Sequence, residues 1–146
     1  MTECIKVLIH AEAADLIPAY ATEGSAGLDL KANQTALLRP GQRAAISTGI
    51  RIELPAGFEA QVRPRSGLAL KHGVTLVNTP GTIDSDFRGE IKLIMINLGD
   101  QDFQIERGDR IGQLVVAPVT KVEWIEHPEL SVTTRGEGGF GSSGMQ

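Results

Sequence analysis

The chain has 146 residues and a formal net charge of −4, with 14 Lys and Arg against 18 Asp and Glu. A chain of this length forms one domain that buries roughly 68–70% of its unfolded surface. Binding to duplex nucleic acid requires a basic face, so the acidic composition predicts no nucleic-acid partner.

Apolar residues recur in short runs between Gly- and Pro-containing turns, which is typical of an all-β domain. We expect one short helix over 66–72 and no membrane partner, because the longest apolar run is far short of the ~20 residues that a span needs. The stretch IKLIMINL (91–98) is apolar on nearly both faces and predicts a central strand buried on two sides. The strands are predicted at 5–9, 28–32, 44–54, 58–63, 75–78, 90–98, 103–105, 114–119 and 122–125.

This pattern favours a β-sandwich or a jelly-roll-like barrel whose sheet edges must be covered, and oligomerisation is one way to cover them. The N-terminal stretch lacks a secretory signal pattern. The lone Cys4 forbids an internal disulfide and suits a reducing compartment, so we expect a cytoplasmic protein.

After Thr134 the composition changes to glycine and serine, so we expect a β-barrel domain over 1–134 and a separate Gly-rich arm over 135–146. The unhindered N–H groups of such an arm can wrap phosphate oxygens. Arg135 adds a cation and Phe140 a ring that can stack on a base. The alternative is a disordered tail.

Two aspartates, Asp84 and Asp86, lie in the stretch GTIDSDFRGEI (81–91). One carboxylate could serve as the base for a water molecule, because an ionised Asp is an acceptor that can take a proton. The alternative is a hairpin loop in which both aspartates bond their own backbone.

Three further stretches combine turn residues with polar side chains. In PRSGLA (64–69), an arginine and a helix start could hold an anion, although a serine there is more often a simple N-cap. AGLDLKA (26–32) and RGDRIGQL (107–114) each place one polar residue, Asp29 or Gln113, among apolar neighbours. Taken singly, each stretch is more often a structural turn than a site.

Taken together, five stretches of the chain resemble the five motifs of the trimeric deoxyuridine triphosphate nucleotidohydrolases, the dUTPases. In chain order they are AGLDL, PRSGLA, GTIDSDFRGEI, RGDRIGQL and RGEGGFGSSG. The resemblance extends from Ala26 to Gly144. It implies a jelly-roll-like (β-clip) barrel that assembles as a homotrimer, with a flexible C-terminal arm closing over a neighbouring subunit's site. It also implies hydrolysis of dUTP to dUMP and pyrophosphate with Mg²⁺, which keeps uracil out of DNA and supplies dUMP for thymidylate synthesis.

By motif position, the resemblance assigns Asp84 as the base that activates water for attack on the α-phosphorus. Mg²⁺ would be held mainly by the substrate's phosphates, with Asp29 acting through water. The implied phosphate-binding residues are Arg65, Ser66, Gly67, Gln113, Arg135, Ser142 and Ser143. The implied uracil- and deoxyribose-binding residues are Asn78, Thr82, Ile83, Phe87, Lys92 and Phe140.

The chain departs from the family at Phe87, where the family usually has tyrosine; the ring that stacks on deoxyribose is kept, but its hydroxyl is absent. Two alternative functions stay open. A dCTP deaminase-like or bifunctional enzyme shares the fold and would need an acid/base glutamate, for which Glu90 is the one carboxylate near the hairpin besides the aspartates. A non-catalytic trimeric module that binds nucleotides would not depend on Asp84.

Overall fold

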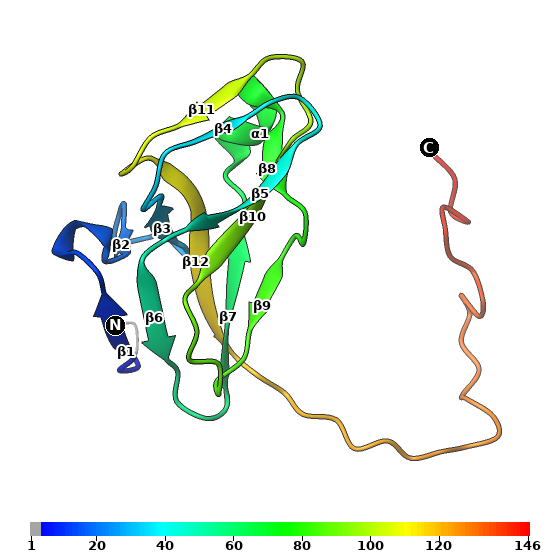
Figure 1. The fold of residues 1–146 in the computed structure, drawn as a ribbon. Helices are drawn as coiled ribbons and strands as arrows, with labels where there is room; N and C mark the ends of the chain where they lie inside the picture. The colour runs from blue at the N-terminus through cyan, green and yellow to red at the C-terminus, as the bar shows by residue number, and fades with distance from the viewer. Residues whose placement is uncertain (1–3) are drawn as a thin grey trace.

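The computed structural model describes residues 4–146 as a body of antiparallel strands followed by an extended C-terminal segment (Figure 1). Two short helices interrupt the strands, η1 (Ala14–Leu16) and α1 (Ser66–His72). The strands are β1 (Leu8–Ala11), β2 (Ala19–Tyr20), β3 (Leu28–Lys31), β4 (Ala36–Leu38), β5 (Arg43–Ser47), β6 (Ile50–Glu53), β7 (Phe58–Arg63), β8 (Val74–Leu76), β9 (Gly81–Ile83), β10 (Lys92–Asn97), β11 (Phe103–Ile105) and β12 (Arg110–Pro118).

The largest sheet has five strands in the order β2-β3-β12-β7-β9. Its longest strand, β12, pairs with β3 on one side and β7 on the other, so Leu114 lies opposite both Leu28 and Val62. A second sheet has the order β5-β10-β8, and two ribbons, β1-β6 and β4-β11, complete the body. Every pairing among these strands is antiparallel.

The core consists of aliphatic side chains from the sheets and ribbons. Leu30, Ile46, Ile50, Leu93 and Ile105 are each completely buried and belong to one continuous apolar cluster. Their removal from water supplies the main driving force for bringing the sheets together. The all-β class predicted from the turn spacing is therefore confirmed.

Strand β10 is the central strand predicted over 91–98, but it is not buried on both faces as predicted. It is the central strand of its sheet, but its side chains alternate between buried and open positions. Leu93 and Met95 face the core, whereas Ile94 is 38% exposed. Burial on both faces is therefore not achieved within residues 4–146, and the outer face of this sheet, where Ile94 lies opposite Ala45, is left open.

Helix α1 occupies 66–72 as predicted and ends at Gly73, whose φ of 68° is left-handed. A side chain at this position would also lie 2.7 Å from the backbone nitrogen of Gly99, so glycine is required there. Within residues 4–146, neither helix has the length and apolar character that crossing a membrane requires.

Val119 is tied to the body by the hydrogen bond that its backbone N–H donates to the carbonyl of Gly57 (2.9 Å). Beyond Val119 the chain leaves the body and runs away from it to the C-terminus (Figure 1). Trp124 is 86% exposed and Val132 is 99% exposed. The strand predicted over 122–125 is wrong, because within residues 4–146 this segment pairs with no strand. Its apolar alternation thus has no counterpart among the described residues.

Candidate active site

Strands β3, β7 and β12 bring together several of the residues predicted to bind phosphate. Gln113 on β12 lies directly opposite Asp29 on β3 and opposite Arg63 on β7. Its Nε2 donates a hydrogen bond to the carbonyl of Pro64 (3.1 Å), where β7 turns into α1. The turn with Arg65, Ser66 and Gly67 therefore lies beside Gln113, and the single chain builds this part of the predicted site.

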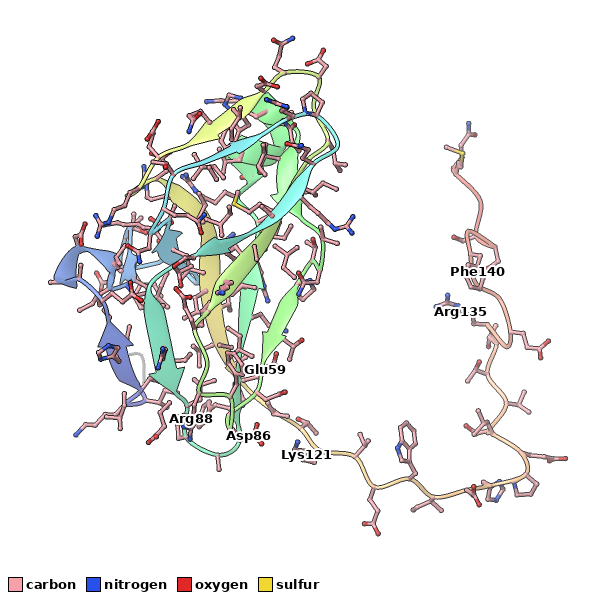
Figure 2. The ribbon with its side chains drawn as sticks, viewed as in Figure 1. Glu59, Asp86, Arg88, Lys121, Arg135 and Phe140 are labelled. Atoms are coloured by element: carbon pink, nitrogen blue, oxygen red, sulfur yellow. The ribbon has the colours of Figure 1, made fainter. Side chains whose placement is uncertain are left out.

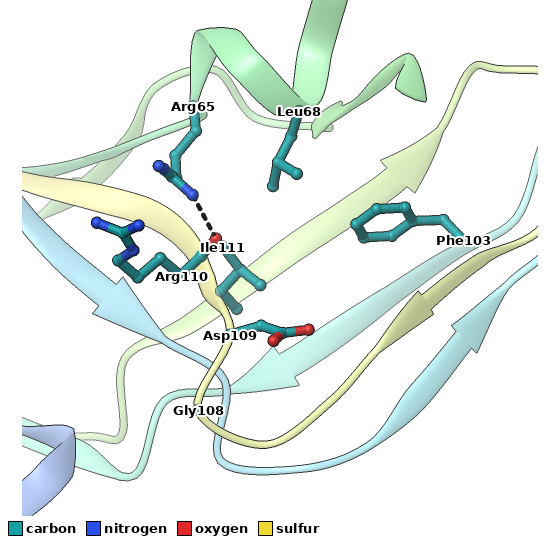
Figure 3. A pocket seen from close by; sticks show the side chains of 7 residues that line it. All are labelled: Arg65, Leu68, Phe103, Gly108, Asp109, Arg110 and Ile111. Atoms are coloured by element: carbon teal, nitrogen blue, oxygen red, sulfur yellow. Dashed lines mark hydrogen bonds between the residues drawn. The ribbon is translucent and has the colours of Figure 1, made fainter. Parts of the chain in front are cut away.

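A cavity of about 340 Å³ opens next to this turn (Figure 3). The guanidinium of Arg65 donates to the carbonyl of Arg110 (3.0 Å), and the guanidinium of Arg110 lies 3.5 Å from the carboxylate of Asp29. Figure 3 shows both guanidinium groups on one side of the cavity, with Leu68 and Phe103 on the other. Two cations held by sheet and turn suit a multiply charged anion such as a triphosphate.

The sequence pattern does not single out Arg110, although it belongs to the stretch RGDRIGQL. Gln113, three residues later, stands out as a polar residue among apolar ones, whereas an arginine after a turn gives no such contrast. The structure shows what the pattern could not, that Arg110, Arg65 and Asp29 are neighbours.

The predicted uracil hairpin lies at the edge of the five-stranded sheet, where β9 pairs with β7. The side-chain amide of Asn78 lies next to Gly81. A Cβ atom placed on Gly81 would lie 3.1 Å from the Asn78 Nδ2 atom. Thr82 is exposed, whereas Ile83 is 7% exposed and belongs to the core cluster. The turn that follows carries Asp84 on the surface and is closed by the hydrogen bond from Phe87 N to Asp84 O (3.1 Å).

Within one chain, Asp84 and Arg65 lie at opposite ends of β7. Ile83 pairs with Ala60, and Arg65 follows Ala60 by five residues, which corresponds to about 16 Å along an extended strand. Figures 1 and 2 show the same separation, with α1 at one end of the body and Asp86, Arg88 and Glu59 at the other. A single chain therefore does not place the predicted base and the predicted phosphate ligands around one phosphorus atom.

Glu90 has a structural task at the exit of the hairpin. One of its carboxylate oxygens accepts hydrogen bonds from the hydroxyl of Ser47 and from the backbone N–H of Gly49 (3.0 Å). Its other oxygen lies 3.9 Å from the ammonium of Lys92, the first residue of β10. These contacts tie the hairpin to the bend between β5 and β6, which disfavours Glu90 as the mobile acid/base of a deaminase.

The remaining predicted residues lie in the C-terminal segment, away from the body (Figure 2). Local turns shape this segment: Arg135 Nε donates to Gly138 O (2.6 Å) and Ser142 N donates to Gly139 O (3.0 Å). Phe140 is fully exposed and has a left-handed φ of 51°. The four predicted site residues of this segment are thus exposed to solvent and lie away from the site residues of their own chain; they are Arg135, Phe140, Ser142 and Ser143.

Comparison with known proteins decides which family this arrangement represents. The dUTPase family model matches residues 14–144. The chain belongs to the dUTPase family. A deoxyuridine 5'-triphosphate nucleotidohydrolase of a Hydrogenobaculum species is 60% identical over 131 residues, 89% of this chain and 91% of the relative.

Solved dUTPase structures share the fold. The dUTPase of Staphylococcus bacteriophage 80alpha with dUPNHPP superposes with a TM-score of 0.87 at 26% identity, covering 95% of this chain and 98% of that one. A mutant dUTPase of phage phi11 of S. aureus, in which a structural Mg(II) ion is coordinated, has a TM-score of 0.79 at 20% identity and covers 88% and 100%. The predicted jelly-roll-like barrel and the family resemblance are therefore confirmed.

The side chains present fit Mg²⁺ only as an ion shared with a phosphate ligand. Within residues 4–146, no three Asp, Glu, His or Cys side chains gather into a metal-binding group. Asp29 offers a half-buried carboxylate, a hard oxygen donor whose contact with Arg110 is long at 3.5 Å. Mg²⁺ is commonly bound by one or two carboxylates, several waters and substrate phosphates, and Asp29 suits that arrangement.

Proposed function

We propose that this dUTPase family member hydrolyses dUTP to dUMP and pyrophosphate. The observation that carries the proposal is the cluster formed by Arg65, Arg110, Gln113 and Asp29, which the sheet register holds together beside an open cavity. The cluster supplies the positive charge and hydrogen-bond donors that a triphosphate needs, while the exposed Asp84 supplies a base. Phosphoryl transfer asks a protein chiefly for such positioning and charge stabilisation.

In the proposed reaction, the Asp84 carboxylate takes a proton from a water molecule as its oxygen forms a bond to the α-phosphorus. The bond between that phosphorus and the oxygen bridging to the β-phosphorus breaks, and its electrons leave with pyrophosphate. Arg65, Ser66, Gly67 and Gln113 would hold the phosphate oxygens during this displacement. When bound, Mg²⁺ supplies additional charge neutralisation for the phosphates, and Asp29 would hold it through water.

For recognition of the nucleoside, we propose that the backbone of the hairpin around Thr82 and Ile83 pairs with uracil, with the Asn78 amide beside it. A base with the wrong donors and acceptors leaves buried groups unpaired, which can discriminate by about 10⁴–10⁵. The Phe87 ring would pack on the deoxyribose, where a 2′-hydroxyl would collide. Lys92 lies next to the hairpin through its ion pair with Glu90.

Because Asp84 and Arg65 are separated along β7, the complete site is proposed to combine two subunits of a homotrimer. The exposed apolar side chains of Ile94 and Trp124 support association between copies. In this proposal the arm over 135–146 closes over a neighbouring subunit's site, with Arg135, Ser142 and Ser143 on phosphates and Phe140 on uracil. The rest of the chain, the domain predicted over 1–134, would provide everything else.

The biological role proposed for the reaction is to keep uracil out of DNA and to supply dUMP for thymidylate synthesis. A cytoplasmic location, for which the exposed Cys4 thiol is suited, stays a prediction.

The first experiment is to measure pyrophosphate release from dUTP, dCTP, dTTP and UTP with Mg²⁺ present. We expect release from dUTP to be far faster than from the other three, and equal rates would contradict the proposed pocket. Asp84→Asn should keep nucleotide affinity but reduce kcat at least about a hundredfold, because it removes a general base. Asp86→Asn, two residues along the same turn, is the matched control and should retain activity.

Two further measurements, ammonia release from dCTP and equilibrium nucleotide binding, separate the alternative functions. Ammonia released from dCTP would identify a deaminase, and the engagement of Glu90 with Ser47 and Gly49 makes this outcome unexpected. Nucleotide binding without turnover, unaffected by Asp84→Asn, would identify a non-catalytic binding module.

A further inference from the structure

Gly89 lies two residues after Phe87, against the outer end of its ring. A Cβ atom built on Gly89 would lie 2.6 Å from Cζ and 2.9 Å from Cε1 of the Phe87 ring. Carbon atoms do not approach so closely without repulsion, since their optimal separation is about 3.5–4.0 Å. The ring therefore occupies space that exists only because residue 89 has no side chain.

The backbone of the turn is held separately from the ring. Phe87 N donates to Asp84 O (3.1 Å), and the Arg88 guanidinium donates to the carbonyls of Ser85 (2.6 Å) and Phe87 (3.2 Å). Arg88 also lies 3.3 Å from the carboxylate of Glu53. A clash at position 89 would therefore be relieved by rotating the ring, which is 44% exposed, and not by rebuilding the turn.

We propose that Gly89 is a positioning residue for sugar selectivity, because it sets the orientation of the Phe87 ring. The inference rests on the proposed function, in which this ring packs on the deoxyribose and excludes a 2′-hydroxyl. A phenylalanine has no hydroxyl through which a hydrogen bond could fix its ring, so the shape of the surface beneath it is decisive. That surface is the bare backbone of Gly89.

The test is the ratio of kcat/KM for dUTP to kcat/KM for UTP. Gly89→Ala should lower this ratio at least about tenfold while the melting temperature stays close to that of the wild type. Gly24→Ala is the matched control, because a Cβ there meets nothing within 4 Å and should leave the ratio unchanged. Neither glycine has a positive φ, so alanine suits both backbones.

A double-mutant cycle separates an effect on the ring from a general disturbance. Phe87→Leu shortens the side chain above Gly89 and should itself lower the ratio. In that background Gly89→Ala should lower it no further, because the atoms that clash are gone. If Gly89→Ala alone failed to fold, recovery of folding in the double variant would support the proposal, and failure to recover would overturn it.

The outcomes also distinguish this inference from the proposed function. A wild-type enzyme that treats dUTP and UTP alike would refute the proposed sugar contact. A selective wild type whose ratio falls with Phe87→Leu but not with Gly89→Ala would overturn only the role of Gly89. Additive effects of the two substitutions would overturn it as well.

Discussion

Asn97 is a buried polar residue whose three hydrogen bonds hold one end of the body together. It is completely buried, and its Nδ2 donates to the carbonyls of Leu38 (2.9 Å) and Gln101 (2.7 Å). Its Oδ1 accepts from the backbone N–H of Gly99 (2.9 Å). Strands β4 and β10 and the loop after β10 are thus joined through one side chain, and Asn97→Ala would remove all three bonds.

The expected cost follows from those contacts. A buried group left without a partner costs about 1–3 kcal/mol; the bond to Leu38 is buried and the other two are partly buried, so losing all three costs about 3–5 kcal/mol. That is a large share of the 5–15 kcal/mol that typically stabilises a domain. At about 3 °C per kcal/mol for a domain of this size, the melting temperature should fall by about 9–15 °C. Asn97→Asp should be at least as destabilising near neutral pH, because it turns a carboxylate oxygen toward two carbonyl oxygens.

Thermal unfolding followed by circular dichroism at one fixed protein concentration measures the effect, since the stability of an oligomer depends on concentration. Gln101→Ala is the control, because it keeps the carbonyl that Asn97 binds and removes only a surface side chain. A decrease of less than about 3 °C for Asn97→Ala would refute the reasoning, because it corresponds to about 1 kcal/mol, the net value of a single hydrogen bond.

Two more predictions concern an ion pair and the arm. Asp15 and Arg107 form two hydrogen bonds (2.8 and 3.1 Å), and that bonding lowers the pKa of Asp15 below its ordinary value of 3.8. The pair should therefore add stability above pH 3.8 that is lost as the pH falls through the lowered pKa. The melting-temperature difference between wild type and Asp15→Asn should close over that range, and a constant difference would contradict this. Deleting 135–146 should leave the subunit count by light scattering unchanged but lower kcat at least about tenfold, and full activity would contradict the lid role.

The sequence was most informative where local chemistry determines structure. The Pro-Arg-Ser start and the glycine at 73 place α1 correctly, and the turns on either side of 58–63 place β7 correctly. Prediction from the sequence failed where the structure of a segment depends on contacts with residues outside that segment. The alternating apolar residues at 122–125 resemble a strand, but no strand in the described part of the chain pairs with them. The run at 91–98 has two apolar faces, and one of them stays open in the single chain.

The site was predictable as a set of motifs but not as an arrangement. No spacing along the chain reveals that Gln113 faces Asp29, because that depends on the register between β3 and β12. Nor could the sequence show that β7 separates Asp84 from Arg65, since the β7–β9 pairing sets that distance. Arg110 became a candidate only once the fold placed it beside Asp29.

If subunits share the site as proposed, the placement of Asp84 and Arg65 at the two ends of β7 has a genetic consequence. Two inactive forms of the protein, one defective at each end of the strand, should rescue each other when their subunits assemble together. With random mixing in equal amounts, about a quarter of the sites in a closed ring would receive an intact half from each parent. A cell carrying both defective alleles would then regain part of the enzymatic activity that neither allele provides alone.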